Sequence, residues 1–146
     1  MQCKDIIERI EAVYPKEAAL GFDHVGLQVG RKKKEVRRIC LALDATEEVV
    51  QYAVESHADL LITHHPLLFQ PLECVTEEDF VGRRVWKLIQ NDISYYAMHT
   101  NYDVLGMAEL AGRILHLQDA QVLDVTMERN QKEEGIGRIG MLKKPL

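Results

Sequence analysis

Residues 60–69 read Leu-Leu-Ile-Thr-His-His-Pro-Leu-Leu-Phe, and the rest of the chain is organised around this stretch. Its first four residues are typical of a buried strand. The strand ends abruptly in His64 and His65, and Pro66 favours an extended or turn conformation for His65. Because consecutive side chains of an extended backbone point to opposite sides, the two imidazoles can serve two neighbouring metal ions more easily than one. The alternative is a pair of turn histidines bonded to carbonyls and water.

The composition is that of an ordinary globular protein. The 146 residues suffice for one compact domain with a buried core, and 47% of them are hydrophobic and 28% charged. No apolar run is long enough for a membrane span, and the amino terminus is charged where a signal peptide would need its apolar core. The net charge of −5 argues against nucleic acid as a partner. Three cysteines without a Cys-x-x-Cys pair indicate reduced thiols, so we expect a cytoplasmic protein with no membrane partner.

Apolar and turn-forming residues alternate in the way that βαβ units require. The expected strands are residues 27–29, 39–43, 60–63 and 93–98, and the expected helices are residues 3–14, 46–57, 76–89 and 107–116. Residues 121–126 are a further candidate strand. This order predicts an α/β fold with a mostly parallel sheet and helices on both faces.

The strand at 39–43 is expected to be buried, and Thr46 can cap the helix that follows it. Thr76 opens the next helix with a cap-like arrangement. The expected apolar face of that helix, with Trp86 at one edge, consists of Phe80, Val81, Val85, Leu88 and Ile89.

Metal-ligand side chains follow three of the expected strands. Asp44 ends the first, His64 and His65 end the second, and His99 follows the third, with Asp103 four residues later. Ligands of open parallel sheets bind beyond the carboxyl ends of the strands, so these residues are predicted to meet at one edge. Asp103 is the candidate bridge between two ions, one held by each of the paired histidines. His99 and Asp44 are further ligands, partners that fix an imidazole tautomer, or turn formers.

Two other segments have alternative interpretations. Asp23 and His24 either face the site and its substrate or serve as a turn-capping aspartate and a surface histidine. The basic run at residues 31–34 could bind phosphate or nucleic acid, but Glu35 follows it in an acidic protein. A solvated loop is therefore the preferred interpretation of this run.

A site with two divalent transition metal ions, such as zinc, iron, manganese or nickel, predicts hydrolysis. Such a site lowers the pKa of a bridging water and binds an anionic or carbonyl substrate. Two ions need more protein ligands than His64, His65 and Asp103 provide, and residues 107–146 add only His116 and scattered carboxylates. The site is therefore incomplete, or its remaining ligands lie outside this chain.

Three motifs occur in the order of a known family. They are Gly-Leu-Gln-Val-Gly at 26–30 after Asp23, Thr-His-His-Pro-Leu at 63–67, and His-Thr-Asn-Tyr-Asp at 99–103. Together they resemble the Nif-three-like dinuclear-metal family, whose bacterial members are often labelled GTP cyclohydrolase 1 type 2 homologs. The glycine-rich residues 135–140 fit the dinucleotide-binding fingerprint by letter, but no strand is expected before them and no helix after them. In this resemblance they are the passage into the second half of the family's chain.

The resemblance implies a Nif-three-like three-layer domain, a toroidal homo-oligomer and a cytoplasmic location. It also implies that His64, His65 and Asp103 are metal ligands. Two departures stand out: Asp23-His24 replaces the family's usual Asp-Asn, and the His-x-x-x-Glu motif of its carboxy-terminal half is not in these residues. The chain thus resembles the amino-terminal half, with a metal-binding domain at 1–127 and the start of a second half or a tail at 128–146.

Two functions follow from these observations. The first is a metal-dependent hydrolase that acts on a nucleotide-like or other small anionic substrate, with a metal-activated water as nucleophile. The alternative is a non-catalytic metal-binding or protein-interaction module that retains an incomplete site. The sequence identifies no general base and no loop that cradles phosphate, so the catalytic residues are not assigned.

Overall fold

The computed structural model describes residues 1–144, whose contacts form two compact units. The first unit comprises Met1–Val13 and Phe22–His99, and the second comprises Tyr14–Gly21 and, of the described residues, 100–144. The boundary expected at residue 127 falls within a strand of the second unit. As a domain boundary it stays a prediction.

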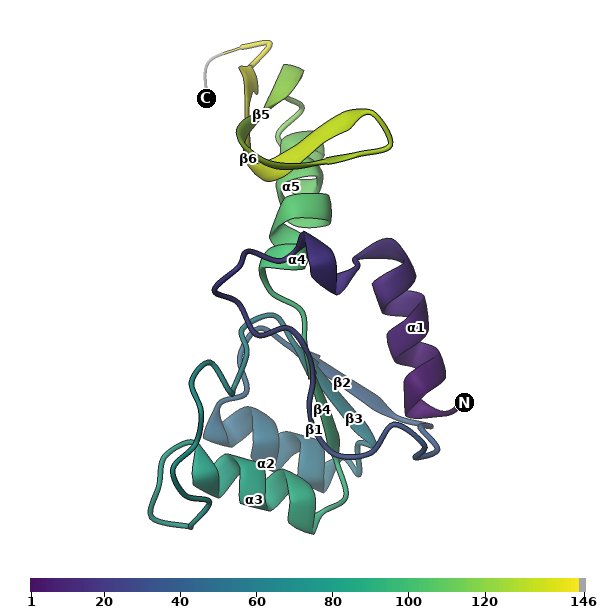
Figure 1. Ribbon diagram of the computed structural model, residues 1–146, viewed down its shortest axis with the longest axis vertical. Helices are drawn as coiled ribbons and strands as arrows, with labels where there is room; N and C mark the ends of the chain where they lie inside the picture. The colour runs from purple at the N-terminus through teal and green to yellow at the C-terminus, as the bar shows by residue number, and fades with distance from the viewer. Residues whose placement is uncertain (145–146) are drawn as a thin grey trace. The chain divides into compact units, whose positions relative to one another are not determined.

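The first unit is built on a four-stranded sheet. Its strands are β1 (Gly26–Val29), β2 (Ile39–Ala42), β3 (Leu60–Thr63) and β4 (Ser94–Ala97), in the order β1-β4-β3-β2 (Figure 1). β3 pairs in parallel with both β2 and β4, whereas β1 is antiparallel to β4. The prediction of a mixed α/β fold with a mostly parallel sheet is therefore confirmed.

Helices contact both faces of this sheet. α2 (Glu47–Glu55) and α3 (Gly82–Gln90) pack with Leu61 and Tyr95 in one apolar cluster. α1 (Cys3–Val13) packs with Leu60, Ile62 and Tyr96 in a second cluster. Neighbouring residues of one strand thus enter different clusters, as the pleat of a strand requires. Every residue of β3 and β4 is buried, which is typical of a strand covered on both faces.

β2 is not the buried strand that its apolar sequence predicts. Cys40 packs against the cluster formed by α2 and α3, but Ile39 and Leu41 are 43% and 73% exposed. β2 lies at the edge of the sheet, and its only strand neighbour is β3. An apolar run does not reveal whether a strand is central or at an edge, and so this exposure could not be predicted from the sequence.

The two helices after β2 begin in different ways. α2 begins as predicted, because the Thr46 side chain accepts a hydrogen bond from the amide of Val49 over 3.2 Å. α3 begins at Gly82 and not at Thr76, the cap expected from the sequence. The carboxylate of Asp79 accepts hydrogen bonds from the amides of Val81 and Gly82, and so it takes the capping role.

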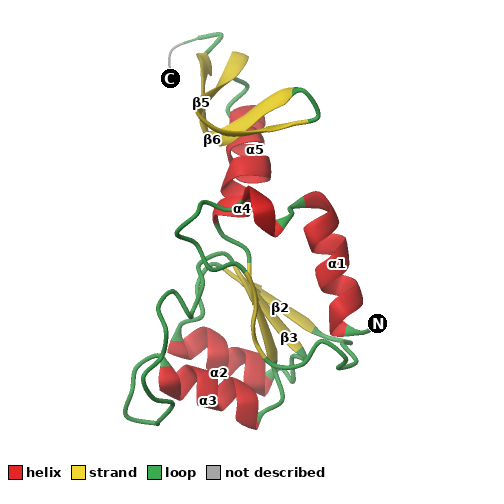
Figure 2. Ribbon diagram, viewed as in Figure 1, coloured by secondary structure: helices red, strands yellow, loops and turns green. Residues whose placement is uncertain are grey.

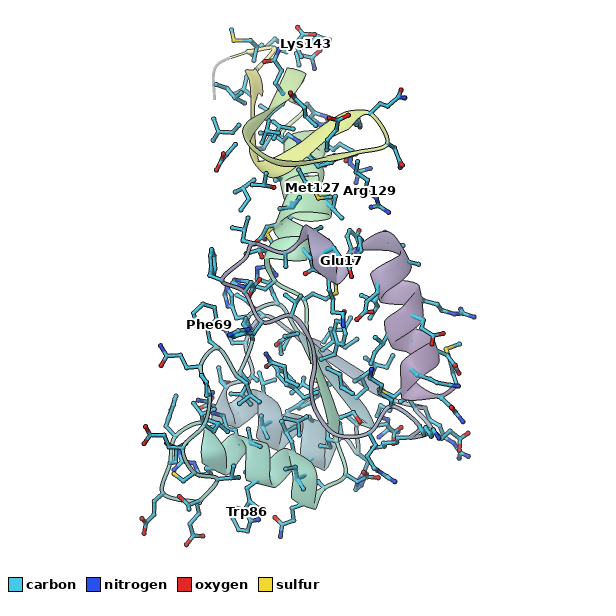
Figure 3. The ribbon with its side chains drawn as sticks, viewed as in Figure 1. Glu17, Phe69, Trp86, Met127, Arg129 and Lys143 are labelled. Atoms are coloured by element: carbon cyan, nitrogen blue, oxygen red, sulfur yellow. The ribbon has the colours of Figure 1, made fainter. Side chains whose placement is uncertain are left out.

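The buried face of α3 also differs from the expected one. Val85 and Leu88 are buried as predicted, but Ile89 is exposed, and Figure 3 shows Trp86 pointing away from the sheet. Arg84 is buried instead, and its guanidinium donates hydrogen bonds to the carbonyls of Ala45 (2.7 Å) and Phe80 (3.0 Å). Such hydrogen bonds offset part of the cost of burying the cation.

The second unit combines short helical segments with a hairpin (Figure 2). Its elements are the 3₁₀ helix η1 (Lys16–Ala18), α4 (Thr100–Tyr102), the π-helix η2 (Asp103–Met107), α5 (Ala108–Ile114), β5 (Gln118–Arg129) and β6 (Lys132–Met141). The expected strand at 121–126 is part of β5, but it pairs only with β6 and lies outside the main sheet. The glycine-rich residues 135–140 are part of β6. Among residues 1–144, no helix has the length and apolar character to cross a bilayer.

The close approach of the two hairpin strands explains one of these glycines. Asn130 and Gln131 both adopt positive φ at the turn, as type I′ hairpins require. A β-carbon on Gly135 would lie 1.9 Å from the carbonyl oxygen of Asp124 on the opposite strand. Gly135, one of the glycines that fit the nucleotide fingerprint by letter, is therefore required by strand pairing in the hairpin.

Gly30 provides a test of the first unit. It has a φ of +97°, and a β-carbon there would lie 2.7 Å from the Cα of Ser94. We expect Gly30→Ala to lower the free energy of unfolding by about 2 kcal/mol or more, measured by urea denaturation. Gly21→Ala is the control: a β-carbon there meets no atom within 4 Å, and the change should stay within about 0.5 kcal/mol. Equal denaturation midpoints for the two variants would contradict the prediction.

Candidate metal centre

Three imidazoles meet at the carboxyl edge of the sheet. His64 and His65 directly follow β3, and His99 lies two residues after the end of β4. β3 and β4 are parallel neighbours, so both chains leave the sheet at the same edge. The ring centroids are 4.9 Å apart for His64 and His65, 5.2 Å for His64 and His99, and 5.6 Å for His65 and His99.

The two neighbouring histidines converge, although extended backbone would separate them. Strand pairing stops at Thr63, and residues 64 and 65 lie in a bend. The amide of His65 donates a 3.0 Å hydrogen bond to the carbonyl of Leu43, which fixes the bend next to the end of β2. The expectation that these side chains point to opposite sides is therefore wrong, because it assumed that the strand continues through His65.

Asp44 holds the imidazole of His65. Its Oδ1 lies 2.7 Å from Nδ1 of His65, and both side chains are about half exposed. An ionised carboxylate only accepts hydrogen bonds, so Nδ1 carries the proton in the neutral ring. This geometry leaves Nε2 of His65 as the nitrogen that can bind a metal ion.

Asp23 forms the same kind of pair with His99. Oδ1 of Asp23 lies 3.0 Å from Nδ1 of His99 and also accepts a 2.8 Å hydrogen bond from the amide of His24. The Asp23 side chain is fully buried, and a buried carboxylate requires such donors. Asp23 and Asp44 thus have the geometry of residues that orient an imidazole, one of the alternatives left open by the sequence.

The remaining two predicted residues are His24 and Asp103. The ring centroid of His24 is 6.2 Å from that of Phe69, which in turn lies 6.4 Å from that of Phe22, in an exposed aromatic group. Asp103 belongs to the second unit, where it begins η2. It follows His99 by four residues, and an extended chain of that length spans at most about 14 Å. The role of Asp103 as a metal ligand stays a prediction.

The spacing of the imidazoles suits metal binding. One nitrogen from each of His64, His65 and His99 lies within 4.8 Å of the other two. Two ligands of one tetrahedral zinc ion lie about 3.4 Å apart, because each bond is about 2.0–2.1 Å long. Side-chain movements that shorten the nitrogen–nitrogen distances by up to about 1.4 Å would therefore place all three around one ion, and ligands of different ions in a pair can be farther apart. Neutral imidazole is a ligand for zinc, copper, iron and nickel.

Two side chains that support this centre were not expected from the sequence. Gln28 on β1 accepts a hydrogen bond from the amide of Leu68 (2.9 Å), and its amide nitrogen donates to the carbonyls of Leu68 (3.0 Å) and His24 (2.8 Å). It therefore joins the segment after Pro66 to the segment that carries Asp23. Tyr95, buried in β4, contacts the segment on both sides of Pro66. Burial raises the pKa of Tyr95, so the phenol stays protonated.

Two of the four basic side chains after β1 form ion pairs with nearby carboxylates. Nη2 of Arg31 lies 2.7 Å from Oδ2 of Asp92, and Nζ of Lys34 lies 3.7 Å from Oδ1 of Asp59. These contacts tie the segment to the ends of β3 and β4 that lie opposite the histidines. They fit the preferred interpretation of a structural loop.

A cleft is also present in the second unit. It has a volume of about 720 Å³ and is lined by α5 and the β5–β6 hairpin, including Arg113, His116 and Arg138. None of the predicted site residues lines it. The Arg138 guanidinium is already bonded to the carbonyls of Gly135 and Gly137 and to Glu134. The histidine cluster, with its metal-ligand chemistry, is therefore the candidate site.

Comparisons with known proteins identify relatives over the whole chain. The model of a family described as Duf34/NIF3 (NGG1p interacting factor 3) matches residues 1–146. A Clostridium perfringens protein named GTP cyclohydrolase 1 type 2 homolog is 40% identical over 148 residues, which cover 100% of this chain and 56% of that protein. A relative with the same name from Listeria innocua is 40% identical over 80% of this chain and 32% of its own length. The chain thus spans about half, or less, of the length of these relatives.

Two solved structures share the fold. Reduced HcgD from Methanocaldococcus jannaschii has a TM-score of 0.85 and 34% identity, over 98% of this chain and 55% of that one. A Bacillus cereus protein related to NIF3 has a TM-score of 0.82 and 42% identity, over 87% of this chain and 36% of that one.

The two carboxylate–imidazole pairs predict a defined tautomer that can be measured without metal. In chelator-treated protein at about pH 8, where an unperturbed imidazole is neutral, long-range ¹H–¹⁵N spectra should show His65 and His99 protonated at Nδ1. Asp44→Ala should release His65 into a mixture of tautomers and leave His99 unchanged, and Asp23→Ala should do the reverse. Each variant is the control for the other. Identical spectra for His65 with and without the Asp44 carboxylate would contradict the assigned role.

Proposed function

Because the chain belongs to the DUF34/NIF3 family, we propose that it holds two divalent transition metal ions and takes part in metal-dependent hydrolysis of a nucleotide-like or other small anionic substrate. The observation that carries this proposal is the cluster of His64, His65 and His99, two of whose rings are bonded to carboxylates. The name of the Clostridium relative, a GTP cyclohydrolase 1 type 2 homolog, supports the nucleotide-like class.

The proposed ligands are His64, His65 and Asp103, with His99 as a further nitrogen donor. Asp44 and Asp23 orient two of the rings and make their metal-binding nitrogens more basic. When bound, a divalent ion lowers the pKa of a coordinated water and polarises a carbonyl or phosphoryl group. The scaffold is proposed to be the family's three-layer domain, with the sheet between α1 and the α2–α3 pair.

Exposure indicates how a substrate approaches. The His65 and Asp44 side chains are 47% and 48% exposed, whereas those of His99 and Asp23 are 20% and 0% exposed. A ligand from solvent therefore reaches the His65 side of the cluster first. The His99 side is buried and largely shielded from solvent. Because water is excluded from the His99 side, the effective dielectric constant there is lower and electrostatic interactions are stronger.

The ligand count supports a contribution from outside these residues. Three imidazoles and one carboxylate do not complete the coordination of two ions that take four or more ligands each. We propose that the remaining positions are filled by substrate, water and residues outside this chain, and that the working form is a homo-oligomer. This chain covers 56% of the Clostridium relative and 32% of the Listeria relative, so both relatives contain residues that have no counterpart in it.

The partial ligand set of these residues favours one other function. A domain with part of the ligand set can bind metal without catalysing hydrolysis, and it would then act as a metal-binding or protein-interaction module. Such a metal-binding module would contain metal, as the hydrolase does, but it would not turn over a substrate.

Elemental analysis of untagged protein prepared without chelator tests the proposal. We expect about two equivalents of transition metal in the wild type and a loss of most of it in His64→Ala/His65→Ala. His57→Asn/His116→Asn is the control, since it removes two histidines outside the cluster, both of which have positive φ that Asn tolerates. This control should keep its metal.

Turnover separates the two functions. The metal-loaded wild type should hydrolyse at least one compound in a set of nucleotides and phosphoesters, and both chelation and the double alanine variant should abolish that activity. Metal binding without turnover would favour the module. If neither the wild type nor the control contains metal after incubation with zinc, iron, manganese or nickel, the hydrolase and the metal-binding module are both wrong for this chain, and a protein-interaction module remains.

A further inference from the structure

The turn that carries the paired histidines is bonded to two buried hydroxyls. Thr63 is the last residue of β3, Tyr95 lies on the neighbouring strand β4, and both are almost completely buried. Their oxygens are 2.6 Å apart. The Thr63 hydroxyl lies 2.7 Å from the carbonyl oxygen of His65, and the Tyr95 hydroxyl lies 3.0 Å from the same oxygen and 2.9 Å from the amide nitrogen of Leu67.

Counting hydrogens fixes the direction of these bonds. Each hydroxyl has one proton to donate, so the three contacts among Thr63, Tyr95 and the His65 carbonyl cannot all be full hydrogen bonds at once. The two shorter contacts give one consistent order. The Leu67 amide donates to Tyr95, Tyr95 donates to Thr63, and Thr63 donates to the His65 carbonyl. Hydrogen bonds in such a chain strengthen one another.

This chain of bonds spans Pro66. Proline has no amide proton, so the turn cannot be held by a backbone bond from Pro66 itself. The two hydroxyls instead connect the peptide groups on either side of it, the His65 carbonyl and the Leu67 amide. Because β3 and β4 pair in parallel immediately before the turn, the hydroxyls are anchored in the most buried part of the sheet.

We propose that Thr63 and Tyr95 are positioning residues for the metal centre, which hold the His64–His65–Pro66 turn so that both imidazoles face His99. They touch neither substrate nor metal and act through the backbone of His65. The metal part of this inference rests on the proposed function, whereas the effect of the hydroxyls on the turn can be measured without metal.

The sequence offers a matched control in the next residue. Tyr96 lies on the same strand and is also fully buried, but it faces the cluster packed on α1 and its hydroxyl donates to Glu11 over 3.2 Å. Tyr95→Phe and Tyr96→Phe each remove one buried phenolic oxygen and keep the ring. A general loss of stability should therefore appear in both variants. A displaced His64–His65–Pro66 turn should appear only in Tyr95→Phe.

Zinc affinity, measured by competition with a chromophoric chelator, is the first readout. Tyr95→Phe and Thr63→Val should each weaken zinc binding by about tenfold or more, the range for residues that orient a metal ligand. Their effects should be less than additive when combined, because either change breaks the same chain of bonds. Thr63→Ser, which keeps the hydroxyl, should restore affinity close to that of the wild type, and Tyr96→Phe should not change it.

The second readout uses chelator-treated protein. Imidazole resonances of His64 and His65 should shift in Tyr95→Phe and Thr63→Val and stay in place in Tyr96→Phe and Thr63→Ser. Equal zinc affinity and equal imidazole spectra in Tyr95→Phe and Tyr96→Phe would overturn the positioning role and leave the proposed function intact. If the wild type binds no metal, the proposed function fails, and the imidazole spectra alone decide whether the hydroxyls position the turn.

Discussion

The parallel pairing of β3 with β2 on one side and β4 on the other is the constraint on which the site depends. It brings three strand ends to one edge, so Asp44, the paired histidines and the segment leading to His99 leave the sheet side by side. The pairing is possible because β3 and β4 are apolar enough to be covered on both faces. A site built on such strands is held more rigidly than one on long loops.

Burial of the sheet also determines the polar chemistry around the imidazoles. At the half-exposed side of the cluster, Asp44 and His65 share one hydrogen bond with solvent nearby. At the buried side, Asp23 needs donors from both His99 and the backbone, and the segment that carries it is tied by Gln28 to the segment after Pro66. The two carboxylates thus differ in the number of protein donors they need, because Asp44 is accessible to solvent and Asp23 is not. A desolvated carboxylate without such donors would be strongly unfavourable.

The sequence predicted the elements of the first unit and the edge where its ligand residues gather. Both inferences depend on local signals, namely apolar runs, the Thr46 cap and the residues that follow each strand. It failed where the outcome depends on three-dimensional neighbours: the exposure of Leu41 on an edge strand, the replacement of Thr76 by Asp79 as a cap, and the hairpin formed by the glycine-rich segment. The convergence of His64 and His65 was missed because it depends on where strand pairing stops, which no periodicity reveals.

Tyr95 and Gln28 show why the support of a site is harder to predict than its ligands. A histidine or aspartate at a strand end is visible because its chemistry is unusual there, whereas a tyrosine inside a strand is the residue that strand propensity favours. Its function depends on one oxygen atom and on what lies beside that oxygen. Tyr95 and Tyr96 are indistinguishable by composition, burial and strand, and differ only in the face to which each side chain points. That face is set by the register of β4 against β3, so the same pairing that gathers the imidazoles also selects which tyrosine supports them.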